Sequence, residues 1–395
     1  MREKSIRKIN KDKEIFDYVR KYDDASPIYL KDVFSKYDIA KIDISGLLKK
    51  IRDNENILLI DTRSEKEFND GSIPSSVNFP VLSNEERHST GLVYKKYSQS
   101  AAIRLAMEFA LAKVEKLTKF LKEHDTEKKE ILINCWRGGG RSSYLSKMII
   151  DLGFKTSIVS GGYKAYRNLV HEALYKNKFN FRFIELSGLT GSGKTELLNL
   201  VKNDIPVIDL ELAAHHFSSL FGSVPYELKD FPIVPSQAAF ENNIFSQIIN
   251  YDLNNLPVFL VESESRKVGD FNIPVELYKL MESSPSVLVE SSLDSRVKRI
   301  VRDYFSDKER GIHLMLKILT EKERYFREKL STSKYELAKE CLESGNVYKF
   351  SELFINDFYD LRYKDKGKKH IGKVNLDTMK KEEIVRELKV VMGEN

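Results

Sequence analysis

The chain is poor in cysteine and has no long apolar run. Its 395 residues include only two cysteines, Cys135 and Cys341, which do not form a Cys-x-x-Cys pair. Two isolated thiols support neither a disulfide framework nor a cysteine zinc site, and we expect no resident metal centre of that kind. No apolar stretch approaches the length of a membrane span or a signal-peptide core. The sequence therefore predicts a cytoplasmic protein without a membrane partner.

The composition is otherwise that of a folded, water-exposed protein. Hydrophobic residues make up 41% of the chain and charged residues 31%, which excludes wholesale disorder. A length of 395 residues exceeds one ordinary domain. We therefore expect two domains, with a small appendage.

The net charge of +6 is unevenly spread along the chain. Residues 296–329 contain eleven Lys or Arg against six Asp or Glu, residues 362–373 contain six against one, and residues 1–13 contain six against two. Such clusters suit a polyanionic partner such as RNA. A solvated helix face explains the cluster at 296–329 nearly as well. The RNA-binding candidates are Arg299, Arg302, Lys368 and Lys369.

A cysteine and a glycine-rich turn follow a predicted strand. The apolar residues 131–133 lead into Asn134 and Cys135, and a helical pattern over 143–152 comes after the turn. Backbone N–H groups at the helix start should point into the turn, where consecutive glycines let them converge. Together with two arginines they favour the thiolate of Cys135, a candidate catalytic nucleophile; the alternative is a buried structural cysteine. The predicted anion cradle comprises Arg137, Gly138, Gly139, Gly140, Arg141 and Ser142.

Strand and helix patterns alternate through this part of the chain. Strand patterns lie at 57–60 and 131–133, and we expect a long amphipathic helix over 99–123 and another helix over 143–152. This alternation predicts an α/β fold with a parallel sheet and a site at the carboxyl ends of the strands.

A phosphate-binding motif opens the second half. The apolar strand pattern at 181–186 leads into G-x-x-x-x-G-K-T, and a helical pattern follows. In this context the loop amides wrap phosphate oxygens, Lys194 reaches the outer phosphates, and the Thr195 hydroxyl can ligate Mg²⁺. A P-loop recognises a diphosphate rather than adenine, so the motif does not require ATP hydrolysis. The predicted diphosphate-binding residues are Gly188, Thr190, Gly191, Ser192, Gly193, Lys194 and Thr195.

Further strand patterns lie at 206–209 and 257–262, and Glu262 ends the second. Glu262 resembles the acid of a second P-loop strand, which holds a metal-bound water; a capping or salt-bridged carboxylate is an equal alternative. Residues 294–361 are predicted to be helical, and we assign Cys341 within them to packing without chemistry.

Residues 40–170 resemble a rhodanese domain. The shared features are Asp61-Thr62-Arg63, Glu67-Phe68, Gly71-Ser72-Ile73-Pro74, the Cys135 loop and Gly161-Gly162-Tyr163, although Ser72 replaces the usual histidine. In that family the loop cysteine carries a transferable chalcogen. Here the spacing is Cys-x5-Arg, one residue longer than the usual sulfurtransferase loop and shared with tyrosine phosphatases. The longer loop should accept a tetrahedral anion the size of phosphate.

A rhodanese unit fused directly to this P-loop unit resembles the tRNA 2-selenouridine synthase family over residues 40–365. The expected division is an N-terminal extension (1–38), a rhodanese-like domain (39–172), and a P-loop NTPase-like α/β domain (173–395) with a helical, basic C-terminal region. Further matches are Glu86-Arg87, Gly91, Tyr94-Lys95, Gln237, Phe240-Glu241 and Glu262-Ser263-Glu264-Ser265-Arg266.

The resemblance implies a transferase that converts wobble 2-thiouridine of tRNA to 2-selenouridine, with selenophosphate as the selenium donor and Cys135 as the selenium carrier. It also implies S-geranylation of the sulfur from geranyl diphosphate before selenium enters. Mg²⁺ is a candidate cofactor, and a selenophosphate-producing enzyme is a candidate partner.

Two other classes of function stay open from the residues alone. A phosphatase or arsenate-reductase-like enzyme would use the Cys-x5-Arg loop, but Asn134 stands where phosphatases usually have histidine, and the P-loop would be unexplained. A nucleotide-gated RNA-binding protein would leave Cys135 without a purpose.

Overall fold

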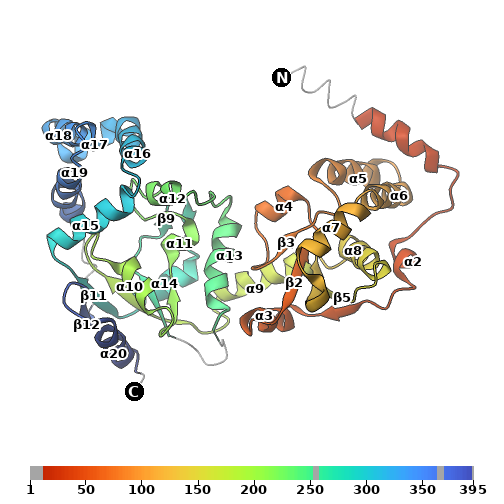
Figure 1. Cartoon of the computed structure of the whole chain (residues 1–395), viewed down its shortest axis with the longest axis horizontal. Helices are drawn as coiled ribbons and strands as arrows, with labels where there is room; N and C mark the ends of the chain where they lie inside the picture. Colours follow the sequence, from red (N-terminus) through yellow and green to blue (C-terminus); the bar gives the residue numbers. More distant parts are fainter. Residues whose placement is uncertain (1–11, 252–257, 363–368, 394–395) are drawn as a thin grey trace. The chain divides into compact units, whose positions relative to one another are not determined.

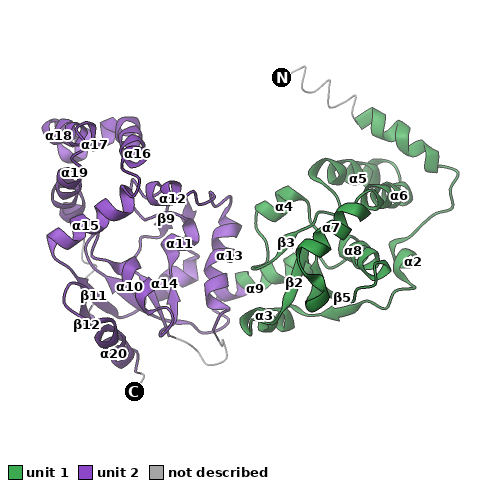
Figure 2. Cartoon of the chain, in the orientation of Figure 1, with its two compact units in different colours: residues 1–170 green, residues 171–395 purple. Residues whose placement is uncertain are grey.

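The computed structural model describes residues 12–251, 258–362 and 369–393 (Figure 1). The chain divides into two compact units, residues 1–170 and residues 171–395 (Figure 2). Each unit is built on a five-stranded sheet whose strands all run parallel, as the alternating patterns predict. Within the described ranges, no helix is both long enough and apolar enough to cross a bilayer.

The sheet of the first unit has the order β1-β5-β4-β2-β3. Its strands are β1 (Ala40–Ile42), β2 (Ile57–Asp61), β3 (Val77–Asn78), β4 (Glu130–Asn134) and β5 (Thr156–Val159). β4 is the middle strand and is buried from its second residue onward. Because parallel strands end at one edge of the sheet, β4 delivers Cys135 to the edge where α/β proteins bind ligands.

Helices flank this sheet. They are η1 (Arg20–Tyr22), α2 (Leu30–Phe34), α3 (Ile44–Arg52), α4 (Glu65–Asn69), α5 (Asn84–Lys96), α6 (Gln99–Leu111), α7 (Val114–Glu123), η2 (Thr126–Lys128), α8 (Gly140–Asp151) and α9 (Gly162–Lys176).

The prediction of one helix over 99–123 is wrong, because the segment forms α6 and α7 with a break at Ala112 and Lys113. The Lys113 ammonium donates to the carbonyl oxygens of Pro80 and Val81, at 3.3 and 3.0 Å, and to the Glu86 carboxylate at 2.5 Å. These three contacts fix Lys113 between α6 and α7. The helix is interrupted here, although the apolar pattern of the sequence continues through both helices.

Two other expected boundaries change. The helix expected over 143–152 begins at Gly140, so Arg141 and Ser142 belong to its first turn. The expected division between residues 172 and 173 falls inside α9, which continues to Lys176 because it keeps burying apolar side chains such as Val170 and Leu174.

The N-terminal extension packs on the first unit. Val19 is fully buried in a cluster with Val93 of α5 and Leu105 of α6. Farther along, the Ile28 amide donates to the Ser100 hydroxyl at 3.0 Å. The described part of the extension is therefore a folded layer of this unit.

The sheet of the second unit has the order β12-β11-β6-β8-β7. Its strands are β6 (Arg182–Ser187), β7 (Val207–Ile208), β8 (Val258–Glu262), β11 (Ser286–Glu290) and β12 (His370–Asn375), and a separate hairpin comprises β9 (Lys267–Val268) and β10 (Phe271–Asn272). The basic cluster 362–373 overlaps β12, because residues 370–373 belong to this strand and pair with β11. The end of the cluster is therefore part of the sheet.

The helices of the second unit include the predicted helical region 294–361, which gathers at one end of the unit (Figure 1). They are α10 (Lys194–Val201), α11 (Leu210–Ala214), α12 (Val224–Leu228), α13 (Gln237–Ile248), α14 (Val275–Ser283), α15 (Leu293–Tyr304), α16 (Lys308–Glu321), α17 (Glu323–Leu330), α18 (Thr332–Glu343), α19 (Val347–Phe354), η4 (Ile355–Tyr359), η5 (Asp360–Arg362) and α20 (Lys381–Met392). Cys341 lies in the apolar core between these helices, where burial raises the pKa of its thiol, so its predicted packing role is confirmed.

Candidate functional site

The Cys135 loop is held in place by the start of α9. The amide of Tyr163 donates to the carbonyl oxygen of Cys135 at 2.8 Å, and the amide of Lys164 donates to that of Trp136 at 2.9 Å. Gly162 has φ +54°, and a Cβ at this position would stand 2.2 Å from the carbonyl oxygen of Cys135. Only glycine allows the loop and α9 to approach this closely.

The thiol of Cys135 meets the first turn of α8. The amide of Gly139 donates to Sγ at 3.3 Å, and the hydroxyl oxygen of Ser142 lies 3.2 Å from Sγ. A backbone donor and the first turn of a helix therefore both face the sulfur atom. Cys135 itself is only 4% exposed, so the predicted nucleophile lies below the surface of the loop.

Arg141 of the predicted cradle is oriented by a carboxylate. Its guanidinium forms an ion pair with Glu67 of α4 at 2.6 Å, and Arg87 pairs with the same carboxylate at 2.9 Å. Although burial opposes it, the Arg141 hydrogen bond and charge hold the pKa of Glu67 below its ordinary value. Arg137 is exposed. The cradle thus has one anchored and one exposed arginine, and its ligand stays a prediction.

A largely apolar pocket of about 680 Å³ opens beside the loop. Arg141 and Gly140 form one border, and Leu30, Val33 and Phe34 of the N-terminal extension contribute to its lining. This pocket could not be predicted from the sequence, because its walls come from four separate segments of the first unit. The other lining residues include Val81, Leu82, Arg87, Tyr94, Met107 and Tyr144.

The predicted P-loop lies between β6 and α10, as its motif requires. Gly188 and Gly193 have φ +151° and +97°, and a Cβ at either position would stand 2.5 Å from Val289 or Leu376. The Lys194 ammonium donates to the carbonyl oxygen of Gly188 at 3.0 Å and so lies across the loop. The structure therefore brings the predicted diphosphate-binding residues together in one loop, and their ligand stays a prediction.

Arg296 of α15 holds the P-loop in place. Its Nε donates to the carbonyl oxygen of Thr190 at 2.8 Å, and its two terminal nitrogens bond to the Asp360 carboxylate at 2.9 and 2.6 Å. Arg296 is 4% exposed. One member of the basic cluster 296–329 is therefore a structural support.

The RNA-binding candidates Arg299 and Arg302 also face the P-loop. Both pair with the Glu196 carboxylate, at 3.0 and 3.1 Å, and both line the P-loop pocket. The Arg299 guanidinium would lie 3.1 Å from a Cβ on Gly193. These contacts favour a role for both arginines at the phosphate site over an open RNA surface. Among the remaining candidates, Lys369 is exposed and Lys368 lies outside the described residues.

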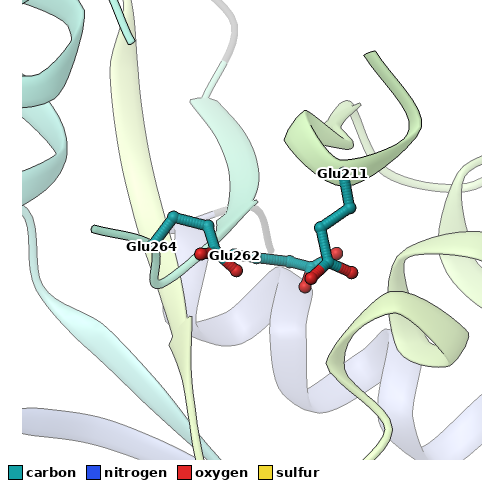
Figure 3. A group of neighbouring side chains, drawn as sticks. All are labelled: Glu211, Glu262 and Glu264. Atoms are coloured by element: carbon teal, nitrogen blue, oxygen red, sulfur yellow. The ribbon is translucent and has the colours of Figure 1, made fainter. Parts of the chain in front are cut away.

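Three glutamates, Glu211, Glu262 and Glu264, gather at one place in the second unit (Figure 3). The Thr195 hydroxyl lies 3.0 Å from Oε2 of Glu211 and 3.2 Å from Oε2 of Glu262. One oxygen each of Glu211, Glu262 and Glu264 lies within 4.8 Å of the others, and all three residues are buried. Burial and the neighbouring Glu264 raise the pKa of Glu211 to about 8, and burial beside Glu211 raises the pKa of Glu262 well above its ordinary value.

Sequence reasoning identified Glu262 but missed the other two glutamates. The available signal was positional, since Glu211 follows β7 and Glu264 follows β8, two paired parallel strands. The carboxyl ends of paired parallel strands lie together, so acids after both can meet.

The pocket at the P-loop has a volume of about 270 Å³ and two kinds of wall. Its polar wall contains the P-loop, the three glutamates, Arg299 and Arg302. The remaining wall is mostly aromatic and includes Phe217, Phe221, Tyr304, Met315, Phe350, Phe354 and Tyr359. The pocket therefore suits a molecule with an anionic head and an apolar or flat body.

These observations define a class of protein: a rhodanese-type cysteine loop and a P-loop phosphate site in one chain. The family model for the rhodanese-like domain matches residues 45–169, and the model described as the tRNA 2-selenouridine synthase AAA domain matches residues 181–390. The chain belongs to the tRNA 2-selenouridine synthase family.

Curated relatives carry the same family name. The tRNA 2-selenouridine synthase of Pseudomonas syringae pv. syringae is 34% identical over 251 residues, which cover 63% of this chain and 66% of the relative. That of Nitrosomonas europaea is 35% identical over 255 residues, covering 62% of this chain and 63% of the relative. The chain thus spans slightly less than two thirds of the length of these relatives.

Among solved structures, the N-terminal domain of a protein from Clostridium difficile 630 is 30% identical. The match covers 33% of this chain and 98% of that domain, with a TM-score of 0.31. A likeness this partial carries no argument about function.

Proposed function

We propose that this protein is an enzyme that converts 2-thiouridine at the wobble position of tRNA to 2-selenouridine, with selenophosphate as the selenium donor. The observation that carries the proposal is the pairing of a cysteine loop with a P-loop in a member of this family. The curated relatives named for the same activity support it.

The Cys135 loop is the proposed site of selenium delivery, with Cys135 as the carrier. Selenophosphate is a tetrahedral anion, and the loop offers it the start of α8 and the amide of Gly139. Arg141, held by Glu67, stands at the border of the adjoining pocket, where it can face a negatively charged substrate.

The P-loop pocket is the proposed site of an earlier alkyl transfer from geranyl diphosphate. The thiocarbonyl sulfur of the uridine would attack C1 of the geranyl group, and the C–O bond would break as diphosphate leaves. Lys194 and the loop amides would bind the leaving diphosphate. The mostly aromatic wall suits the hydrocarbon chain, which gains by leaving water.

In the second step the selenium of selenophosphate would attack C2 of the uridine, the C2–S bond would break as geranyl thiolate leaves, and water would then cleave the Se–P bond and release phosphate. Alkylation makes this exchange easier, because an S-alkyl group departs as a thiolate whereas a thiocarbonyl sulfur does not depart directly. The two sites therefore divide the reaction into activation of sulfur and its replacement.

Nucleoside mass spectrometry of tRNA from cells that lack and then regain the gene tests the proposal. We expect 2-selenouridine to disappear on deletion and to return with the wild-type gene. Return of 2-selenouridine with a gene encoding Cys135→Ala would contradict the proposed role of the loop.

A further inference from the structure

The glutamate cluster at the P-loop pocket brings three buried acidic groups together. Glu211, Glu262 and Glu264 are 8%, 1% and 8% exposed, and their nearest oxygens lie within 4.8 Å of one another. Lys194 is the cation that acts on both Glu211 and Glu262. Buried carboxylates this close together repel one another unless protons or a cation lie between them.

One carboxylate oxygen in the cluster has no hydrogen-bond partner among the residues that the structure describes. Oε1 of Glu262 is fully buried and accepts no hydrogen bond, whereas Oε2 of the same group meets Thr195. A buried carboxylate oxygen left unpaired costs free energy, so it indicates a ligand that the protein itself does not supply. The oxygen belongs to the side chain between the other two glutamates in Figure 3.

The donor set fits a hard divalent cation. It consists of three carboxylates and the Thr195 hydroxyl, all oxygen ligands, with no nitrogen or sulfur among them. Oxygen ligands of this kind select Mg²⁺ or Mn²⁺ over zinc or copper. All four side chains line the pocket, which gives an ion a route from solvent.

We propose that Glu211, Glu262, Glu264 and Thr195 bind one Mg²⁺-type cation before any diphosphate arrives. In an ordinary P-loop site one or two carboxylates share the ion with the substrate phosphates, so the ion depends on the nucleotide. Here three carboxylates converge on one point, and the ion is a resident part of the pocket. When bound, it would supply positive charge facing the diphosphate opposite Lys194. This cation site lies at the diphosphate site of the proposed function, and the role of the cation in catalysis rests on that function.

Titration of the full-length, chelator-treated protein with Mn²⁺ tests the proposal, with free Mn²⁺ followed by electron paramagnetic resonance. We expect one Mn²⁺ to bind per chain without diphosphate, and the bound metal to raise the melting temperature. Glu262→Gln should weaken Mn²⁺ binding by at least about 10–100-fold, the loss seen when only a residue supporting a metal ligand is changed. Glu276→Gln, a control in α14 whose carboxylate pairs with Lys279, should bind Mn²⁺ like the wild type.

Folding of the variant is checked in the same experiment. Glu262→Gln removes one charge from a repelling cluster, so the metal-free variant should melt at or above the temperature of the metal-free wild type. Mn²⁺ that binds only after inorganic diphosphate is added, or binds equally to wild type and Glu262→Gln, would overturn the proposal. Because no tRNA or prenyl donor is present, a failed selenation assay with intact Mn²⁺ binding would reject the proposed function alone.

Discussion

Replacing Lys194 should separate the two chemical steps. The Lys194 ammonium already lies across the P-loop, 3.0 Å from the carbonyl oxygen of Gly188, where it can neutralise charge that grows on a departing diphosphate. Losing one such contact typically slows the step by about 100–1,000-fold, or about 2.7–4 kcal/mol of transition-state stabilisation. Lys194→Ala should therefore lower S-geranylation of thiolated tRNA by at least this factor.

The assay is geranylation of thiolated tRNA by purified enzyme, read by nucleoside mass spectrometry. Lys202→Ala is the matched control, since Lys202 follows the same helix and its ammonium donates to the Asn199 side chain at 3.1 Å. A synthetic S-geranyl tRNA should still be selenated by Lys194→Ala, because that substrate bypasses the first step. Normal geranylation by Lys194→Ala would refute the assignment of the P-loop to the prenyl donor.

Three further predictions address the cysteine loop and the tRNA. Cys135→Ala should abolish formation of 2-selenouridine and leave S-geranylation intact, and retained selenation in this variant would count against the carrier role. Cys341→Ala, in the helical core, should leave both reactions intact. Gly162→Ala should destabilise the protein by about 1–3 kcal/mol and displace the Cys135 loop, since the φ of +54° and the carbonyl oxygen of Cys135 exclude a side chain. The control in thermal melts is Gly91→Ala, because a Cβ at Gly91 in α5 would meet open space. Equal melting temperatures of the two variants would refute the steric argument. Binding of tRNA should weaken steeply with salt, and Lys369→Glu should lower the slope of log affinity against log salt by about 1; a flat titration would show that the basic residues are a solvated face.

The sequence predicted what depends on local pattern. The apolar strand before Cys135, the glycines after it, and the strand-loop-helix context of Lys194 are all encoded within about a dozen neighbouring residues. Their geometry follows from chirality and hydrogen bonding, which act over short distances. The structure confirms these elements at the predicted places.

Features that depend on distant pairing could not be predicted. β12 reads as part of a basic stretch, and it becomes a strand only because β11, more than eighty residues earlier, offers it an edge. Similarly, Glu211 and Glu264 belong to separate segments, and only the pairing of β7 with β8 brings the ends of these strands together. The orientation of the Arg299 side chain toward the P-loop pocket could not be predicted either, because a count of charges does not show which way a side chain of α15 points.

Reconstitution with purified components tests whether geranylation precedes the entry of selenium. Thiolated tRNA, geranyl diphosphate and selenophosphate would be combined with the wild-type chain, with each donor omitted in turn, and nucleosides followed over time by mass spectrometry. We expect S-geranyl-2-thiouridine to form with geranyl diphosphate alone, and 2-selenouridine to form only when both donors are present. Formation of 2-selenouridine without any prenyl donor, or turnover that requires ATP, would contradict this expectation.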